Sequence, residues 1–99
     1  MVTTPEAKAL RVEAGKYLKE LRKSLKLNQK ELADKVGIEF FTFVSQVEIG
    51  AAQMPPGLLK KWADALKIDH KEFATELLKY YQPEYFEMIF GGKARRKPS

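Results

Sequence analysis

The segment from Asn28 to Gly50 constrains the fold more than any other part of the chain, because it carries start and stop signals for two short helices in succession. Asn28 is a good N-cap, and Glu31 follows it at the spacing of a capping box. Gly37 then stands where a left-handed C-cap residue would end the helix and turn the chain. A further helix is expected over about Phe40–Glu48, before Gly50. The segment therefore predicts two short helices joined by a tight glycine-containing turn.

Helical patterns continue on both sides of this segment. Thr4-Pro5 is a typical helix start, and apolar residues then recur at three- and four-residue steps up to about Lys26. Gly15 lowers the stability of this helix by roughly 1 kcal/mol relative to alanine, which favours a break after its first turns. Downstream, proline starts and capping pairs predict helices over about 56–67, 69–81 and 84–90. No stretch alternates as a β-strand does, so the expected fold class is all-α.

The composition excludes several classes of protein. The chain has no cysteine and one histidine, so we expect no disulfide framework, no cysteine nucleophile, no protein zinc site and no cofactor. No apolar run approaches the roughly 20 residues that cross a bilayer, so neither membrane insertion nor secretion is indicated. A reducing, cytoplasmic setting fits these features. His70 follows a helix cap with no triad partner nearby, so no enzyme is expected.

The net charge of +5 is concentrated at the C-terminus. Residues 91–99 hold Lys93, Arg95, Arg96 and Lys97 and no acidic residue, which leaves the rest of the chain almost neutral. A basic tail suits contact with a polyanion, because lysine and arginine displace counterions from phosphates. A flexible solubilising end is an equally acceptable interpretation.

We expect a single domain with three segments. Residues 1–68 would hold the N-terminal helix and the helix pair, and residues 69–90 a helical, aromatic-rich extension of the same domain. Residues 91–99 would form the flexible basic tail.

The helix pair resembles a known family. The runs LNQKELADKVG at 27–37 and VSQVEIG at 44–50 are similar to the phage repressor and Cro-like (Xre) helix-turn-helix family of bacterial and phage DNA-binding regulators. The resemblance covers roughly residues 12–68. It implies a compact five-helix domain of the lambda-repressor type, here with an extra short C-terminal helix and a basic tail. In such domains the second helix of the pair enters the major groove of double-stranded DNA.

The resemblance also implies which side chains contact bases. The residues that match Val44 and Val47 anchor the recognition helix inward, while the residue that matches Gln46 faces base edges. A glutamine can pair with N6 and N7 of adenine, and a threonine can meet a thymine methyl group, so an A·T-containing half-site is expected. The expected base contacts are Phe41, Thr42, Ser45 and Gln46.

Phosphate contacts are expected at the start of the first helix of the pair. The glutamine that matches Gln29 binds a phosphate in the family, and a helix N-terminus offers exposed amides and a positive dipole end. The expected phosphate contacts are Asn28, Gln29, Lys30, Gln53, Lys60 and, in the tail, Lys93, Arg95, Arg96 and Lys97.

Two features depart from the family pattern. Twelve residues separate Gly37 from Gly50, one more than usual, so the turn or the start of the recognition helix must take up an additional position. Phe40, Phe41 and Phe43 also stand where the family often has small polar residues, and helical spacing cannot direct all three inward. We expect Phe40 and Phe43 to pack in the core, and Phe41 to meet thymine methyl groups or a base step.

Aromatic residues near the C-terminus favour a partner surface, because so small a domain has little interior to bury them. We expect a two-fold homodimer, which places two recognition helices on half-sites about one helical turn, or a multiple, apart. The alternative is that residues 83–90 fold back over their own domain. The expected dimerisation residues are Phe73, Tyr80, Tyr81, Tyr85, Phe86 and Phe90.

Two functions from different classes fit these features. The first is a sequence-specific, nucleoid-associated transcriptional regulator, acting as a repressor and bound to a pseudo-palindromic operator as a homodimer. The second is an antitoxin that binds its own operator and neutralises a toxin protein through the aromatic C-terminal segment. Non-specific architectural DNA binding is disfavoured, because residues 1–90 are barely basic.

Overall fold

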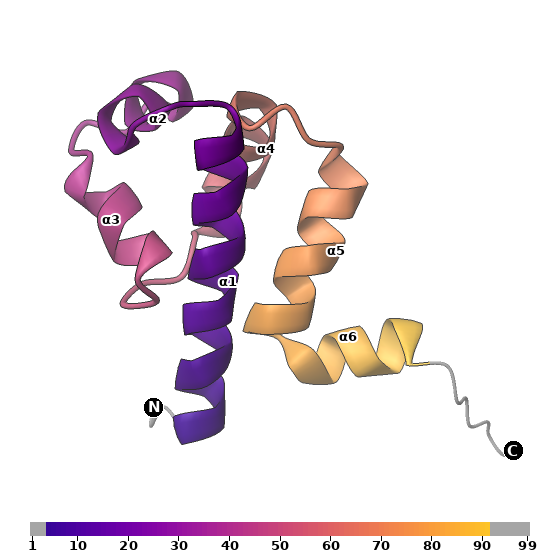
Figure 1. Cartoon of the computed structure of the whole chain (residues 1–99). Helices are drawn as coiled ribbons and strands as arrows, with labels where there is room; N and C mark the ends of the chain where they lie inside the picture. Colours follow the sequence, from indigo (N-terminus) through magenta and orange to yellow (C-terminus); the bar gives the residue numbers. More distant parts are fainter. Residues whose placement is uncertain (1–3, 92–99) are drawn as a thin grey trace, which may run out of the picture.

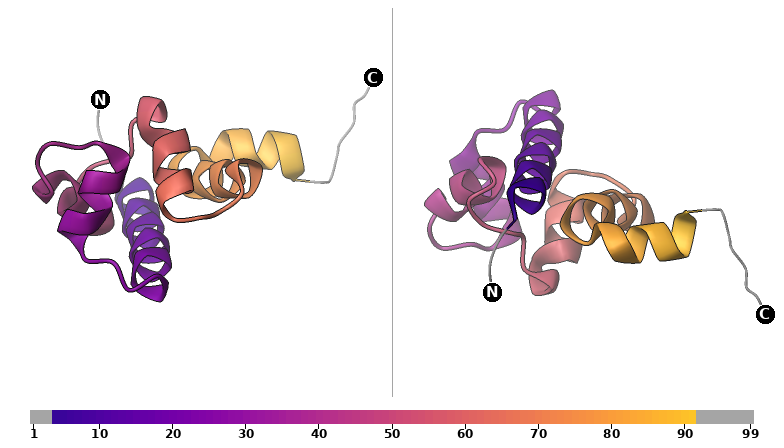
Figure 2. Two further views of the ribbon diagram at one scale, coloured as in Figure 1. Left: turned by 90° about the horizontal axis from the view of Figure 1, so that it is seen from above. Right: turned by 90° about the horizontal axis from the view of Figure 1, so that it is seen from below.

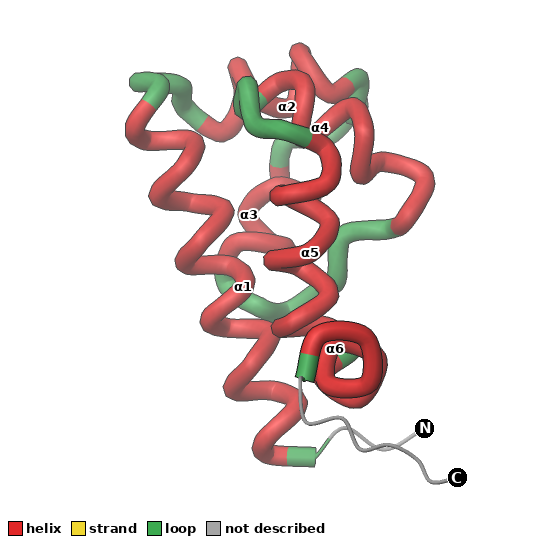
Figure 3. Tube along the Cα trace, turned by 90° about the vertical axis from the view of Figure 1, so that its right-hand side faces the viewer, coloured by secondary structure: helices red, strands yellow, loops and turns green. Residues whose placement is uncertain are grey.

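The computed structural model describes residues 4–91, which contain helices and turns and no strand (Figure 3). The first helix, α1 (Pro5–Ser24), begins as predicted, because the Thr4 hydroxyl accepts a hydrogen bond from the Ala7 amide at 3.0 Å. It ends before the expected Lys26, which adopts a positive φ of 59°.

Gly15 does not break α1, so the predicted interruption is wrong. A Cβ atom built at Gly15 would lie 2.1 Å from the carbonyl oxygen of Glu48, which belongs to another helix. Glycine is required here because the two backbones touch. Gly15 weakens α1 locally, but it allows α1 to approach the helix that ends at Glu48.

The predicted capping box at the second helix, α2 (Gln29–Val36), is confirmed. Asn28 Oδ1 accepts from the Glu31 amide at 2.7 Å, and Glu31 Oε1 accepts from the Asn28 amide at 2.8 Å. Gly37 ends α2 with a φ of 91°, in the left-handed conformation that the sequence predicts.

The next helix, α3 (Thr42–Glu48), begins later than the predicted Phe40. Residues 37–41 therefore form the turn, and the turn takes up the additional position. Phe40 lies in this turn and is 66% exposed, so its predicted place in the core is wrong. Phe43 does pack inward, with its ring edge-on to Trp62 at a centroid distance of 6.5 Å.

The remaining helices start at the predicted signals. The expected fourth helix is split into a 3₁₀ turn, η1 (Pro56–Leu58), and α4 (Leu59–Ala65). Asp69 caps α5 (His70–Tyr81) by accepting from the Glu72 amide at 3.0 Å, and α6 (Pro83–Phe90) begins at its proline. The all-α fold class is confirmed for the described residues.

The helices are arranged around α1 (Figure 1). In that view α2 and α3 lie on one side of α1 and α5 lies on the other, and α1 packs against both α3 and α5. Helix α6 packs on α5 and extends away from the helix pair. Seen from above and from below, α3 and α6 lie at opposite ends of the molecule (Figure 2).

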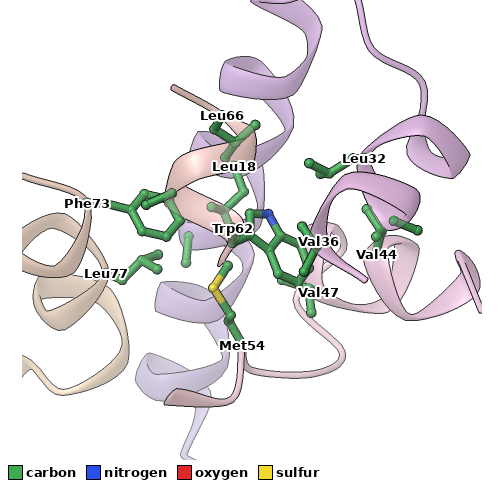
Figure 4. Close-up of a cluster of buried hydrophobic side chains, with 13 residues drawn as sticks. Leu18, Leu32, Val36, Val44, Val47, Met54, Trp62, Leu66, Phe73 and Leu77 are labelled. Atoms are coloured by element: carbon green, nitrogen blue, oxygen red, sulfur yellow. The ribbon is translucent and has the colours of Figure 1, made fainter. Parts of the chain in front are cut away.

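One hydrophobic core joins five of the helices, with the indole of Trp62 at its centre (Figure 4). Phe73 from α5 is 1% exposed within this core, so its predicted place on a dimer surface is wrong. Because α5 supplies core residues, residues 70–81 belong to the same packed unit as the helix pair. The buried apolar side chains are Ala14, Leu18, Leu32, Ala33, Val36, Val44, Val47, Met54, Trp62, Ala63, Leu66, Phe73 and Leu77.

Candidate nucleic-acid interface

Helix α3 turns one side to the core and the other to solvent. Val44 and Val47 are fully buried, as their predicted anchoring role requires. Thr42 and Gln46, four residues apart and therefore on one face, are exposed, and Ser45 is half-buried beside them. The structure thus brings the three predicted polar base contacts together on one helix.

Ile49 extends this exposed face, and the sequence reasoning missed it. The residue follows α3 directly and is 61% exposed. Its spacing of three from Gln46 and seven from Thr42 was the available signal, because these steps return to the same side of a helix.

Two aromatic rings stand at the N-terminal end of α3. Phe41 is 47% exposed, as predicted, and Phe40 is more exposed still. Phe41 holds the N-cap position, yet no side-chain hydrogen bond caps α3. The backbone of Phe41 is helical, with a φ of -65° and a ψ of -16°, and a phenylalanine side chain has no atom that could cap, so neither capping nor core packing accounts for these two rings.

A buried ion pair joins the inner side of α3 to α1. The guanidinium of Arg22, in α1, donates from Nε to Glu48 Oε2 at 2.8 Å and from Nη2 to Oε1 at 3.1 Å. Its third nitrogen, Nη1, donates to the Leu27 carbonyl at 2.7 Å. The two charged side chains are 8% and 1% exposed, so this two-pronged contact is shielded from water.

The sequence itself contains a signal for this buried pair. Arg22 follows Leu18 by four residues, which puts a basic side chain on the inward stripe of α1. Glu48 follows Val44 at the same spacing on α3. A cation and an anion on two facing apolar stripes favour a buried pair, because an isolated buried charge is costly.

Gln29 connects α2 to the same carboxylate. Its side chain is half-buried, and Nε2 donates to Glu48 Oε1 at 3.0 Å. The phosphate contact expected of Gln29 stays a prediction. One N–H of its side-chain amide is bound to Glu48, which leaves the second N–H and the backbone amides of α2 as donors at this end. The helices α1, α2 and α3 are therefore joined by the side chains of Arg22, Gln29 and Glu48.

The other expected phosphate contacts are spread over three segments. Lys30 is exposed at the start of α2 and lies 3.8 Å from Asp34, while the Asn28 oxygen is used in the cap. Gln53 is exposed in the loop after α3. Lys60, on α4, lines a hollow together with His70 of α5. Lys93, Arg95, Arg96 and Lys97 lie outside the described residues.

Neither a metal centre nor a membrane span is found within residues 4–91. No group of three or more histidine, cysteine, aspartate and glutamate side chains in this range could hold a metal ion. No helix in the described part of the chain is long and apolar enough to cross a membrane. The side chain of His70 is 51% exposed, and its Nε2 lies 2.7 Å from Asp64 Oδ1.

Most of the predicted dimerisation residues contact other residues of their own chain. Tyr80 lies against Tyr17 with a centroid distance of 6.2 Å, and the Tyr81 hydroxyl accepts from the Met54 amide at 3.3 Å. Phe86 is half-buried and contacts Phe90 at a centroid distance of 5.1 Å. These four side chains and the buried Phe73 therefore have contacts within their own chain.

Helix α6 presents a larger apolar surface than the aromatic residues alone predict. No residue of this helix is buried. Its exposed large side chains are Tyr85, Met88, Ile89 and Phe90, two of which are not aromatic. A hollow of about 350 Å³ lies beside them, lined mainly by apolar side chains that include Met54, Leu77, Tyr81, Ile89 and Phe90.

Comparison with known proteins matches the part of the chain that contains the helix pair to a family. The family model described as Helix-turn-helix matches residues 18–73, more than half of the chain. A solved structure, the restriction-modification controller protein C.AhdI from Aeromonas hydrophila, is 34% identical with a TM-score of 0.61. That match covers 66% of this chain and 97% of the controller protein. No curated protein matches significantly. Helix α6 lies outside the residues matched by the family model.

Proposed function

The chain belongs to the Cro/C1-type helix-turn-helix family of DNA-binding transcription regulators, which are not enzymes, and we propose that it is a repressor that binds a pseudo-palindromic operator as a homodimer. The observation that carries this proposal is the exposed face of α3. Thr42 and Gln46 point to solvent from a helix whose opposite side is anchored in the core by Val44 and Val47.

The side chains on this face suit bases that lie in A·T pairs. Gln46 can donate to N7 and accept from N6 of adenine, and Thr42 can contact a polar base edge or a thymine methyl group. Ser45 offers a hydroxyl that can donate or accept. Helix α3 contains no lysine or arginine, so its contribution to binding is base recognition rather than charge.

The N-terminus of α2 is the proposed phosphate seat. Lys30 supplies an exposed ammonium there, and the first amides of α2 have no partners within the helix. Because Glu48 holds Gln29 at the same end, this seat is fixed relative to α3. A phosphate bound there would set the register in which Gln46 meets the bases.

The outer face of α6 is the proposed dimer contact. Tyr85, Met88, Ile89 and Phe90 are exposed, and burial of such a side chain contributes about 1.5–3 kcal/mol. The hollow beside α6 can receive side chains from a second copy, as a two-fold interface built from one patch requires. Since α6 and α3 lie at opposite ends of the molecule (Figure 2), this contact leaves both DNA-reading faces open.

A matched pair of variants tests the dimer. Ile89 and Ile49 are both 61% exposed, but the first lies on α6 and the second follows α3. We expect Ile89→Glu to sediment as a monomer at micromolar concentration, while Ile49→Glu sediments as a dimer like the unchanged chain. A monomeric unchanged chain, or equal behaviour of both variants, would exclude α6 as the contact.

Regulation through an operator is supported by the likeness to a restriction-modification controller protein. Repression follows when the bound site overlaps a promoter and excludes the polymerase. Selection from a random DNA pool tests sequence reading: the enriched duplexes should contain two related half-sites with A·T pairs whose enrichment disappears in Gln46→Ala. Transcription from a promoter that carries the selected site should then fall when the protein is added.

A further inference from the structure

We infer that Phe40 and Phe41 read the C5-methyl groups of pyrimidines in the major groove, whether the methyl group belongs to thymine or to 5-methylcytosine. The inference rests on the proposed DNA-binding function and adds a chemical feature of the operator. It starts from two exposed phenylalanines at the end of α3 that enters the groove in proteins of this architecture.

The exposure of these rings is specific to their positions. Phe43, close to them in sequence, packs against Trp62 in the core. Phe40 is instead 66% exposed and Phe41 47% exposed. The domain therefore buries one aromatic side chain of this segment and leaves the other two outside, where they have apolar surface still to bury.

Backbone hydrogen bonds fix the place of both exposed residues. The Phe40 carbonyl accepts from the Phe43 amide at 3.1 Å, and the Phe41 carbonyl accepts from the Val44 amide at 2.9 Å. Phe41 is thus held at the N-terminal end of α3, directly beside Thr42. The rings are carried by an ordered backbone next to the polar reading face.

The major groove offers one apolar group at the edge of a base pair, and that group is the C5-methyl of a pyrimidine. Phenylalanine has no hydrogen-bonding atom in its side chain, so it contacts this methyl group without competing for the donors and acceptors of the bases. Thr42 and Gln46 supply the polar contacts from the same helix. The rings of Phe40 and Phe41 would therefore contact methyl groups, while Thr42 and Gln46 make the hydrogen bonds to the bases.

A scan with deoxyuridine tests the inference, because uracil differs from thymine at this edge by the methyl group alone. Each thymine of the selected operator is replaced by uracil in turn, and the dissociation constant is measured by fluorescence anisotropy at fixed salt. We expect one or two positions in each half-site at which uracil weakens binding about fourfold, the effect of losing one buried methyl-sized group.

Variants connect this effect to the rings. Phe41→Ala and Phe40→Ala should bind the thymine and uracil duplexes with equal affinity at the sensitive positions, whereas Phe41→Leu should retain part of the discrimination. Lys30→Ala is the matched control, because losing a phosphate contact should weaken binding to both duplexes by the same factor. Circular dichroism checks that the variants keep their helices, as expected for substitutions of exposed residues.

A second arm separates the two sources of the methyl group. At each sensitive position the T·A pair is replaced by C·G, with cytosine or 5-methylcytosine. If the 5-methylcytosine duplex binds more tightly than the cytosine duplex, and Phe41→Ala and Phe40→Ala lose this difference, the rings read the methyl group on both bases. If binding is sensitive to uracil but does not gain from 5-methylcytosine, the rings read thymine alone. Sequence-specific binding that depends on Gln46 but is blind to uracil at every position overturns the inference alone. A chain that selects no sequence overturns the proposed function as well.

Discussion

The Nε atom of Arg22 lies 2.8 Å from Oε2 of Glu48, and this buried pair joins the long first helix to the helix that carries the reading face. Gln29 donates to the other carboxylate oxygen from α2. Charged and polar groups on the inner side of α3 therefore fix the orientation of its exposed side, and these groups do not face the proposed DNA-binding surface. Its orientation relative to the N-terminus of α2 follows from these contacts.

Removal of one partner of this pair should destabilise the fold strongly. Arg22→Met leaves the Glu48 carboxylate buried without its cation, and we expect a loss of about 3–5 kcal/mol in the free energy of unfolding. Urea denaturation followed by circular dichroism measures this loss.

The double variant Arg22→Met with Glu48→Leu separates charge from packing. Because it removes both charges together, we expect it to recover most of the stability lost in Arg22→Met. Equal instability of the single and double variants would mean that the charge left behind is not the cause.

Gly15→Ala should destabilise the protein, although alanine normally favours a helix. The added Cβ would meet the Glu48 carbonyl oxygen at 2.1 Å, so α1 and α3 must move apart. Gly57→Ala is the control, since nothing lies within 4 Å of a Cβ there and its φ is not in the left-handed region. A higher melting temperature for Gly15→Ala would show that the close approach is not maintained in solution.

The stability of the fold should decrease in alkaline solution through Tyr17. Burial raises the pKa of this hydroxyl from 10.0 to about 12, and the carboxylates of Glu76 and Glu72 act in the same direction. The folded chain therefore keeps a proton that the unfolded chain releases. This contribution is fully present below pH 10 and is lost as the pH rises towards 12.

Tyr17→Phe removes this titration. The free energy of unfolding of the variant, measured by urea denaturation between pH 9 and about 11.5, should decrease less steeply than that of the unchanged chain. Identical slopes for Tyr17→Phe and the unchanged chain would contradict the assignment to Tyr17.

The basic tail should contribute salt-dependent affinity. A chain that lacks residues 93–99 loses Lys93, Arg95, Arg96 and Lys97. The slope of the logarithm of affinity against the logarithm of salt concentration should then become shallower by about 0.9 for each phosphate contact removed. A slope that does not change would assign the tail to solubility instead.

Local signals in the sequence predicted the helices well. The capping box at Asn28, the stop at Gly37 and the cap at Asp69 all occur where the spacing placed them. These features depend on hydrogen bonds between residues a few positions apart, which a sequence displays directly.

Features that depend on distant contacts were predicted less well. Helix propensity alone predicts a weak point at Gly15, because the carbonyl of Glu48 that approaches this residue lies far along the chain. A helix over Phe40–Glu48 with Phe40 in the core is what the sequence predicts, but α3 begins at Thr42 and Phe40 lies in the exposed turn before it. The prediction that Phe73 lies on a partner surface rests on the small interior expected of so short a chain, whereas the core that α5 forms with the other helices has room for this ring.

The most direct test of the account is a specificity ratio, the dissociation constant for a scrambled duplex divided by that for the selected operator of equal length, both measured at one salt concentration. The unchanged chain and Gln46→Ala are compared, with Lys30→Ala as the control for a phosphate contact. We expect Gln46→Ala to lower this specificity ratio by about 5- to 150-fold, since a bidentate base contact contributes about 1–3 kcal/mol of discrimination, while Lys30→Ala weakens binding to both duplexes alike. A Gln46→Ala variant that keeps the full ratio would contradict the central claim that the exposed face of α3 reads the bases.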